Sequence, residues 1–358
     1  MPPFPQVVAL NEAAFKHQLT RELQVAVAVV FGGTSGIGHA IVEALCEHLG
    51  GRVHVVLVGR DEGSAREVLA AFPTSGEGML REFVQCDVGS LVSVKRACEE
   101  VKQLLEARSV ARVDYLVLNA GYNSWSKHAV TNEGLDLHLE LRYYYRALVA
   151  QELVPLLEAA STPERPARVL SVLGAGFVTK IDLDNLGNTA KPRNGAFRPC
   201  LRGMMMSHAY TDAWFAHLAS MHPAISFIHA HPGAVVTKAL TLDLPFPWGA
   251  PLNALMNLLV RYAPRAIGAV PPRECGEHML WGVHDAKAGM ELRDRYGDVI
   301  SSRGFKAGER IGNGTEPGKL NGTPMKGYSP SDASVHVIVR HTEEVLERVL
   351  GLQVGRAK

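Results

Sequence analysis

The feature that most constrains this chain is a glycine-rich turn that joins a buried strand to a helix. Residues 25–31 are seven consecutive apolar residues rich in valine, a pattern typical of a strand buried on both faces of a sheet. An amphipathic helical pattern begins at residue 37. Glycine lets the backbone approach a ligand closely, and the first turn of a helix attracts anions. The stretch therefore predicts the phosphate-binding turn of a nucleotide fold.

The spacing of the glycines in this turn is less common. Gly32, Gly36 and Gly38 follow the pattern G-x-x-x-G-x-G, whereas the commonest dinucleotide fingerprint is G-x-G-x-x-G. A glycine triplet alone is weak evidence in a chain with 34 glycines, and a turn without a ligand is the alternative. The flanking strand and helix favour a binding site.

Apolar segments alternate with helical patterns through the first two thirds of the chain. Six such segments indicate an α/β fold, a doubly wound parallel sheet of the Rossmann type. We expect one domain, with an N-terminal extension (1–24), a nucleotide-binding core (25–240) and a C-terminal elaboration (241–358). The predicted strands are 25–31, 52–58, 82–86, 113–118, 168–173 and 225–230. The predicted helices include 64–71, 92–107, 137–160, 204–221, 271–285 and 331–352.

Composition limits the compartment and the partners. The net charge of +1 argues against nucleic-acid binding through bulk charge. The N-terminus lacks a basic segment followed by an apolar run, and no apolar stretch of the sequence is long enough to cross a bilayer. Five scattered cysteines form no metal-binding or redox pair. We therefore expect a cytoplasmic protein without a metal or a membrane span.

The second predicted strand ends in residues that bear on cofactor choice. The adenosine ribose of a dinucleotide lies at this strand end. Arg60 would pair with a 2′-phosphate and favours NADP, whereas the carboxylate of Asp61 would bind a free 2′-hydroxyl. A solvated arginine in a turn is the remaining alternative.

Further signals follow the third and fourth predicted strands. Asp87 and Val88 come after the third, where a carboxylate could accept a hydrogen bond from an adenine amino group. Asn119, Ala120 and Gly121 come after the fourth, where small residues let the backbone pass close to the cofactor.

Taken in order, these motifs resemble the short-chain dehydrogenase/reductase superfamily over roughly residues 24–240. The resemblance is closest in style to diverged members from filamentous fungi, which often serve secondary-metabolite pathways. It implies an NADP or NAD cofactor, hydride transfer to or from a carbonyl or alcohol carbon, and a possible homo-oligomer. The positions that match the cofactor site of this superfamily are Gly32, Ser35, Gly36, Ile37, Gly38, Arg60, Asp87, Val88, Asn119, Ala120, Gly121, Pro232, Gly233 and Thr237.

The usual catalytic residues of the superfamily are missing at the matching positions. A tyrosine is expected as proton donor, with a lysine four residues later, but these positions read Met204 and His208. The expected serine falls within residues 172–174, which read Val-Leu-Gly, and the nearest hydroxyl belongs to Ser171. The expected asparagine falls near Arg142.

His208 is therefore the candidate catalytic residue, because imidazole titrates near neutral pH. It could also hold the ribose of the cofactor as a neutral hydrogen-bonding group, or be a structural histidine. A tyrosine from the run 143–145 on the facing helix is another candidate donor.

The apolar and proline-rich segment 240–262 is expected to build the pocket for an apolar metabolite. Packing between helices, or a surface for a partner, is the alternative. The first functional hypothesis is an NADP(H)-dependent oxidoreductase with an unusual proton donor. The second is a cyclase or isomerase of the same fold without a net redox step, in which Met204, Met205 and Met206 form an apolar wall. The third is a non-catalytic NADP-binding protein.

Overall fold

The central strand of the sheet, β1 (Ala26–Phe31), is buried along its whole length. Its side chains alternate between two apolar cores, because successive residues of a strand point to opposite faces. Val27 and Val29 belong to one core, and Ala28 and Val30 belong to the other. A strand of this kind needs helices on both faces of its sheet.

The computed structural model shows that arrangement as a sheet of eight strands among the residues it describes, in the order β3-β2-β1-β4-β5-β6-β7-β8. Neighbouring strands run parallel except β8, which pairs antiparallel with β7. The order reverses between β1 and β4, and folds of this class bind ligands at the carboxyl ends of strands at such a point. The other strands are β2 (Val53–Gly59), β3 (Arg81–Gln85), β4 (Tyr115–Leu118), β5 (Arg168–Val172), β6 (Ser226–Ala230), β7 (Gly289–Arg293) and β8 (Val299–Ile300).

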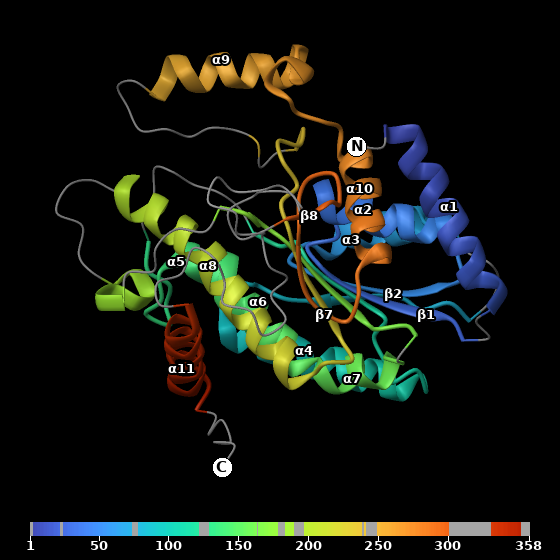
Figure 1. Cartoon of the computed structure of the whole chain (residues 1–358), viewed down its shortest axis with the longest axis horizontal. Coiled ribbons are helices and arrows are strands. Elements are labelled where there is room, and N and C mark those ends of the chain that lie inside the picture. Colours follow the sequence, from blue (N-terminus) through green and yellow to red (C-terminus); the bar gives the residue numbers. More distant parts are fainter. Residues whose placement is uncertain are drawn as a thin grey trace, which may run out of the picture.

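Two layers of helices cover the sheet (Figure 1). One face is covered by α1 (Phe4–Arg21), α2 (Gly36–His48), α3 (Glu62–Ala71) and α10 (Pro272–Asp285). The other face is covered by α4 (Leu91–Ala107), α5 (Leu137–Leu139), α6 (Tyr145–Glu152), α7 (Val154–Ala160), α8 (Phe197–Met221) and α11 (Ser331–Leu350), with the π-helix η1 (Glu140–Tyr144) between α5 and α6. The helix α9 (Gly249–Tyr262) and the 3-10 helix η4 (Pro264–Ile267) follow β6, and the 3-10 segment η2 (Leu183–Asn188) follows β5.

The structure describes residues 3–351 except 22–23, 74–77, 122–128, 163, 178–182, 190–196, 238–239, 241–248 and 301–330. Part of the predicted pocket segment, residues 241–248, lies outside these residues.

The predicted architecture is confirmed, and two predictions were incomplete. All six predicted strands are present within two residues of their expected ends, but β7 and β8 were not predicted. The predicted helix 137–160 is interrupted twice, by the π-helix η1 and by a break at Leu153, ahead of Pro155. The break has a local cause, because proline is accommodated only in the first turn of a helix.

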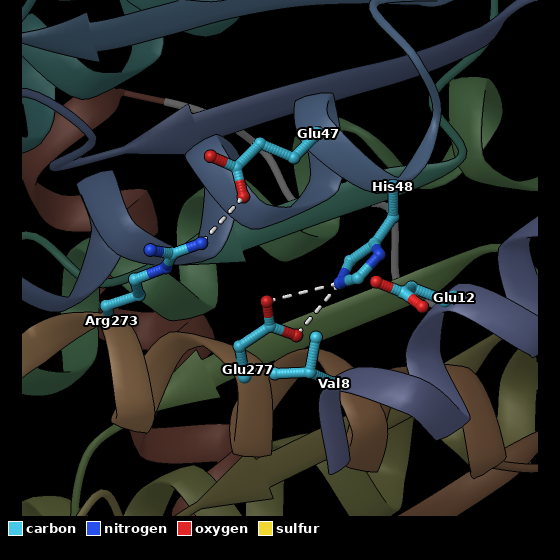
Figure 2. A pocket seen from close by; sticks show the side chains of 6 residues that line it. All are labelled: Val8, Glu12, Glu47, His48, Arg273 and Glu277. Carbon is cyan, nitrogen blue, oxygen red and sulfur yellow. Dashed lines mark hydrogen bonds and ion pairs between the residues drawn. The ribbon is translucent and has the colours of Figure 1, made fainter. Parts of the chain in front are cut away.

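A buried polar cluster joins the N-terminal helix α1 to the helices α2 and α10 (Figure 2). The carboxylate of Glu277 on α10 lies 2.9 Å from His48 Nε2 on α2 and accepts a 2.7 Å hydrogen bond from Asn11 Nδ2 on α1. Burial opposes ionisation of Glu277, but the hydrogen bonds from His48 and Asn11 outweigh it, so its pKa lies below the usual value. Glu277 therefore links three helices through one charge.

Candidate functional site

The glycine turn after β1 has no room for side chains. Gly32 has a φ of +85°, and a Cβ there would lie 2.5 Å from the backbone nitrogen of Ala120. A Cβ on Gly38 would lie 2.3 Å from the carbonyl oxygen of Gly32 and 3.0 Å from Asn119 Nδ2. The ends of β1 and β4 and the start of α2 therefore meet backbone to backbone, at the point where the strand order reverses.

The first turn of α2 opens beside this junction. Ser35 is the N-cap residue, in an extended conformation and exposed, and its side chain makes no capping hydrogen bond. Ile37 is half-buried and packs against the apolar core beneath the turn. Thr237, which follows β6, contacts the same turn, because a Cβ on Gly36 would lie 3.3 Å from its Cγ2 atom. The start of this helix thus leaves backbone N–H groups available to an anion.

The two residues at the end of β2 have different roles. Asp61 caps α3, and its carboxylate accepts hydrogen bonds from Ser64 N at 3.0 Å and Ser64 Oγ at 2.8 Å. Those hydrogen bonds lower the pKa of Asp61. Arg60 is exposed at the carboxyl edge of the sheet. The carboxylate that complicated the sequence interpretation is therefore explained as a helix cap.

Asp87 and Val88 follow β3, next to β2 in the sheet. Asp87 is exposed, and its Oδ1 atom accepts a 3.0 Å hydrogen bond from Gly89 N. Val88 is 7% exposed and packs in the core, so only its backbone is near the surface of the sheet edge.

The segment after β4 passes directly over the end of β1. The backbone nitrogens of Asn119 and Ala120 donate to the carbonyl oxygen of Phe31 at 2.9 Å and 2.8 Å. Gly121 has a φ of +147°, and a Cβ there would lie 3.0 Å from the carbonyl oxygen of Leu141. This packing places the backbone of 119–121 against the glycine turn.

Pro232 and Gly233 follow β6 at the same sheet edge. Gly233 has a φ of +69°, and the side chain of Arg295 fills the space beside it, 2.9 Å from where a Cβ would lie. The carbonyl oxygen of Pro232 lies 3.9 Å from the thiol of Cys275 on α10. These two residues thus turn the chain from β6 towards Thr237.

His208 lies on α8 and is held by an arginine. Its Nε2 atom lies 3.0 Å from Nη2 of Arg142, whose Nε also donates to Ser207 Oγ at 3.2 Å. A guanidinium only donates, so Nε2 of His208 accepts and the ring proton resides on Nδ1. Burial, together with the charge of Arg142, lowers the pKa of His208 well below its usual value. Burial likewise lowers the pKa of Arg142, to about 9. At neutral pH the pair is therefore a neutral imidazole beside a guanidinium cation.

Gly174, one of the positions expected to carry a serine, packs directly against the ring of His208. A Cβ at Gly174 would lie 2.4 Å from the Cε1 and Nε2 atoms of the His208 ring. No side chain fits at residue 174 while the ring stays where it is. Because the His208 ring takes the space of a side chain at residue 174, the glycine there and the histidine on α8 depend on each other.

A second histidine supports the backbone of Gly174 from beneath. Gly174 N donates to Nε2 of His229 at 3.2 Å, and Nδ1 of His229 donates to Oδ1 of Asp212 at 2.5 Å. Both side chains are fully buried. Burial lowers the pKa of His229 to about 3 and raises that of Asp212. Both shifts oppose the charged forms, so burial works against an ion pair between Asp212 and His229.

The three tyrosines that were considered as donors point to other groups. Tyr143 and Tyr144 hydrogen-bond Thr342 and His341 on α11, at 2.5 Å and 2.8 Å. Tyr145 donates to the carbonyl oxygen of Ala120 at 2.6 Å, and burial raises its pKa to about 12. The π-helix η1 directs consecutive tyrosines to different neighbours, and such segments are frequent at functional sites.

Two other candidates are also placed. Ser171 is fully buried, and its Oγ atom accepts from Arg146 Nε at 3.3 Å, within the core. Met204 lies one turn before His208 and is 7% exposed. Among the described residues, no group of His, Cys, Asp and Glu side chains is arranged to hold a metal ion.

Sequence reasoning missed Asp212, His229 and the exact fit at Gly174. Asp212 and His229 carry one usable signal, because each is a polar residue inside an apolar strand or helix and such residues are buried only with partners. Nothing in the sequence paired them with each other.

Comparisons with known proteins agree with this geometry. The family model described as short chain dehydrogenase matches residues 26–150. The chain is 31% identical over 337 residues to the oxidoreductase andH of Emericella variicolor, covering 91% of this chain and 92% of that relative. It is 32% identical over 257 residues to the oxidoreductase AN1596 of Emericella nidulans, covering 71% of this chain and 70% of that relative.

A solved structure shares the fold. The NADPH-bound carbonyl reductase from chicken fatty liver matches with a TM-score of 0.51 and 18% identity, over 78% of this chain and 99% of that chain. The sheet order, the glycine turn and the two fungal relatives agree, and this chain belongs to the short-chain dehydrogenase/reductase family.

Proposed function

We propose that this protein is an NADP(H)-dependent oxidoreductase that transfers hydride to or from a carbonyl or alcohol carbon of a small apolar metabolite. The observation that carries the proposal is the junction of Gly32, Gly38 and Ala120, where a Cβ would overlap backbone atoms. This side-chain-free cradle lies beside the start of α2, where a pyrophosphate is favoured. Asn119 and Thr237 lie against this turn, and Arg60 and Asp87 follow the neighbouring strands β2 and β3.

The preference for NADP over NAD rests on the end of β2. Arg60 is exposed there, and the neighbouring carboxylate of Asp61 is occupied with capping α3. A guanidinium at this place attracts a 2′-phosphate. The fungal oxidoreductases and the NADPH-bound carbonyl reductase described above support a nicotinamide cofactor as a class.

When bound, the nicotinamide would supply or accept the hydride. In the proposal, the guanidinium of Arg142 stabilises negative charge on the reacting oxygen, because its own pKa of about 9 keeps it protonated at neutral pH. His208 fixes the direction of that guanidinium through Nε2. Since the pKa of His208 is well below its usual value, an imidazolium is a poor proton source here, and water is the favoured one.

The class of substrate is proposed from the chain's own residues and its relatives. Met204 is apolar and flexible, and it lies one turn before His208 on α8. Both relatives described above come from Emericella, a filamentous fungus. These features favour an apolar secondary metabolite.

A second candidate function is a cyclase or isomerase of the same fold, or a non-catalytic NADP-binding protein. One observation favours it. The positions expected to hold the tyrosine and the lysine are Met204 and His208, and the stretch 172–174 expected to hold the serine reads Val-Leu-Gly. His208 is neutral near physiological pH. No general acid with a pKa near neutrality therefore stands at these positions.

Calorimetric titration of the full chain with NADPH and NADH tests the cofactor proposal. We expect NADPH to bind more tightly, and Arg60→Ala to weaken NADPH binding about tenfold while leaving NADH almost unchanged. Arg66→Ala is the matched control, because Arg66 is an exposed arginine on α3 that pairs with Glu62. Absence of binding by both nucleotides would refute the proposal. Binding without consumption of NADPH across a panel of carbonyl compounds would favour the second candidate.

A further inference from the structure

The helix α9 carries an apolar face that is exposed to solvent. Leu252, Leu255, Leu258 and Tyr262 are between 44% and 68% exposed. Their spacing of three or four residues places them on one side of the helix. Figure 1 shows α9 set apart from both helix layers. Four large apolar side chains on one exposed helix face exceed the scattered apolar residues of an ordinary surface.

The polar residues of α9 lie on the opposite side. Asn253, Asn257 and Arg261 recur every four residues and form a single stripe. The helix is therefore amphipathic, and four of its apolar side chains face solvent while Met256, Leu259 and Val260 are half-buried.

The sequence around α9 carries charge of one sign. No acidic residue occurs in the sequence between Asp243 and Glu274, whereas Arg261, Arg265 and Arg273 fall in that interval. Because Arg273 pairs with Glu47 at 3.5 Å, Arg261 and Arg265 carry the positive charge of this segment. Arg261 and Arg265 are exposed, and the guanidinium of Arg261 lies over the ring of Tyr262 at 5.4 Å from its centroid. An apolar face that ends in an aromatic ring and basic residues is typical of helices that lie in the headgroup layer of a membrane.

The length of α9 fits a position along a membrane and not across it. Its 14 residues span about 21 Å, less than the hydrocarbon core of a bilayer. None of the helices in the described part of the chain meets the length and hydropathy needed for a membrane span.

The positive charge also distinguishes between possible binding partners of the apolar face of α9. Two copies of this chain that met through α9 would bring together surfaces of the same sign, which opposes association. An anionic phospholipid surface has the complementary charge. We propose that α9 attaches the protein reversibly to anionic phospholipid membranes, with Leu252, Leu255, Leu258 and Tyr262 entering the interface. The helix α9 would then be the partner surface that was the alternative for segment 240–262, and not a wall of the substrate pocket.

The test is cosedimentation of the full chain with phosphatidylcholine vesicles that contain or lack phosphatidylserine. We expect binding to the anionic vesicles, and about a fivefold loss of affinity for each of Arg261→Gln and Arg265→Gln. The double variant Leu255→Asp, Leu258→Asp should abolish binding. The control is Val92→Asp on α4, since Val92 is 56% exposed and lies on a helix other than α9, in the layer that contains α6, α8 and α11. Circular dichroism verifies that each variant is folded.

Three results would overturn the proposal. The first is no binding of the wild-type chain to either vesicle. The second is equal binding by the wild type and the folded double aspartate variant. The third is concentration-dependent dimerisation in analytical ultracentrifugation that the double variant abolishes, without any vesicle binding, which would assign the face to a second copy of this chain. None of these measurements uses a nucleotide or a substrate, so a failed cofactor titration leaves the result interpretable.

Discussion

The imidazole of His208 occupies the space that any side chain at residue 174 would fill. A Cβ on Gly174 would lie 2.4 Å from the ring, closer than such contacts occur. The two residues come from β5's carboxyl end and from α8, and they meet only in the folded chain. This fit defines the shape of the chain at Gly174, one of the three residues (172–174) among which the resemblance places a serine.

Replacing Gly174 tests the fit. Gly174→Ala should destabilise the protein by about 1–3 kcal/mol, because overpacking forces the ring or the backbone to move. The double variant Gly174→Ala, His208→Ala should lose less stability than the sum of the single variants. Urea unfolding measures all three. Gly59→Ala is the control, since a Cβ there meets nothing closer than 4.0 Å. Additive effects would show that residues 174 and 208 do not compete for space.

The tautomer of His208 is a second prediction. Nitrogen-15 NMR of the full chain should show Nε2 unprotonated and Nδ1 protonated near neutral pH, because Arg142 donates to Nε2. Arg142→Met should raise the pKa of His208 by removing a positive neighbour, although burial, the larger cause, keeps it below the usual value. A proton found on Nε2 in the wild type would contradict the assigned hydrogen bond.

Stability should fall as the solution becomes acidic. The pKa values of His208 and His229 are lower in the folded chain than the ordinary value of 6.5. The unfolded chain then binds more protons, so the stability of the neutral rings is complete above about pH 6.5 and is lost as the pH falls. Urea unfolding between pH 8 and pH 5 should show this slope, and His208→Gln should make it shallower. A wild-type stability that stays level over this range would contradict the buried neutral state.

The junction of α1 depends on Glu277. Glu277→Gln should lower the free energy of unfolding by about 1–3 kcal/mol and speed proteolytic cleavage of α1, because His48 and Asn11 lose a charged acceptor. The pKa of Glu277 lies below its usual 4.5, so this stabilisation is present above that pH and is lost on further acidification. Glu47→Gln is the control, since Glu47 is an exposed carboxylate that lines the same pocket. Equal cleavage of both variants would show that α1 is held by its apolar contacts alone.

The first turn of α2 offers a matched pair of glycines. Gly36 and Gly50 have φ values of +62° and +56° and lie at opposite ends of α2. Alanine at either position should cost about 1–2 kcal/mol of backbone strain. Only Gly36→Ala should also weaken NADPH binding in calorimetry, since only Gly36 lies in the turn proposed to bind pyrophosphate. Similar affinities for the two variants would place the nucleotide elsewhere.

The sequence predicted those parts of the molecule that local patterns determine. The apolar run at 25–31, the glycine turn and the small residues at 119–121 each carry their own signal, and the structure brings them together at the end of β1. β7 was not predicted because Glu291 and Arg293 interrupt the continuous apolar pattern of a buried strand. The match between Gly174 and His208 and the hydrogen bond between Asp212 and His229 are contacts across the fold. No hydrophobic period or sequence motif predicts these contacts, so they can be identified only in the folded structure.

The contacts of α11 determine when the site can be completed during synthesis. Thr342 and His341 hydrogen-bond Tyr143 and Tyr144, which immediately follow Arg142 in the chain. A ribosome makes every cofactor motif, from Gly32 to Thr237, before it makes α11. The nascent chain can therefore form its sheet early, while the two tyrosines lack these partners until α11 has emerged. A protein shortened to residues 25–240 would keep the cofactor-binding motifs of the family and lose α11, whose side chains hydrogen-bond the tyrosines of the π-helix η1.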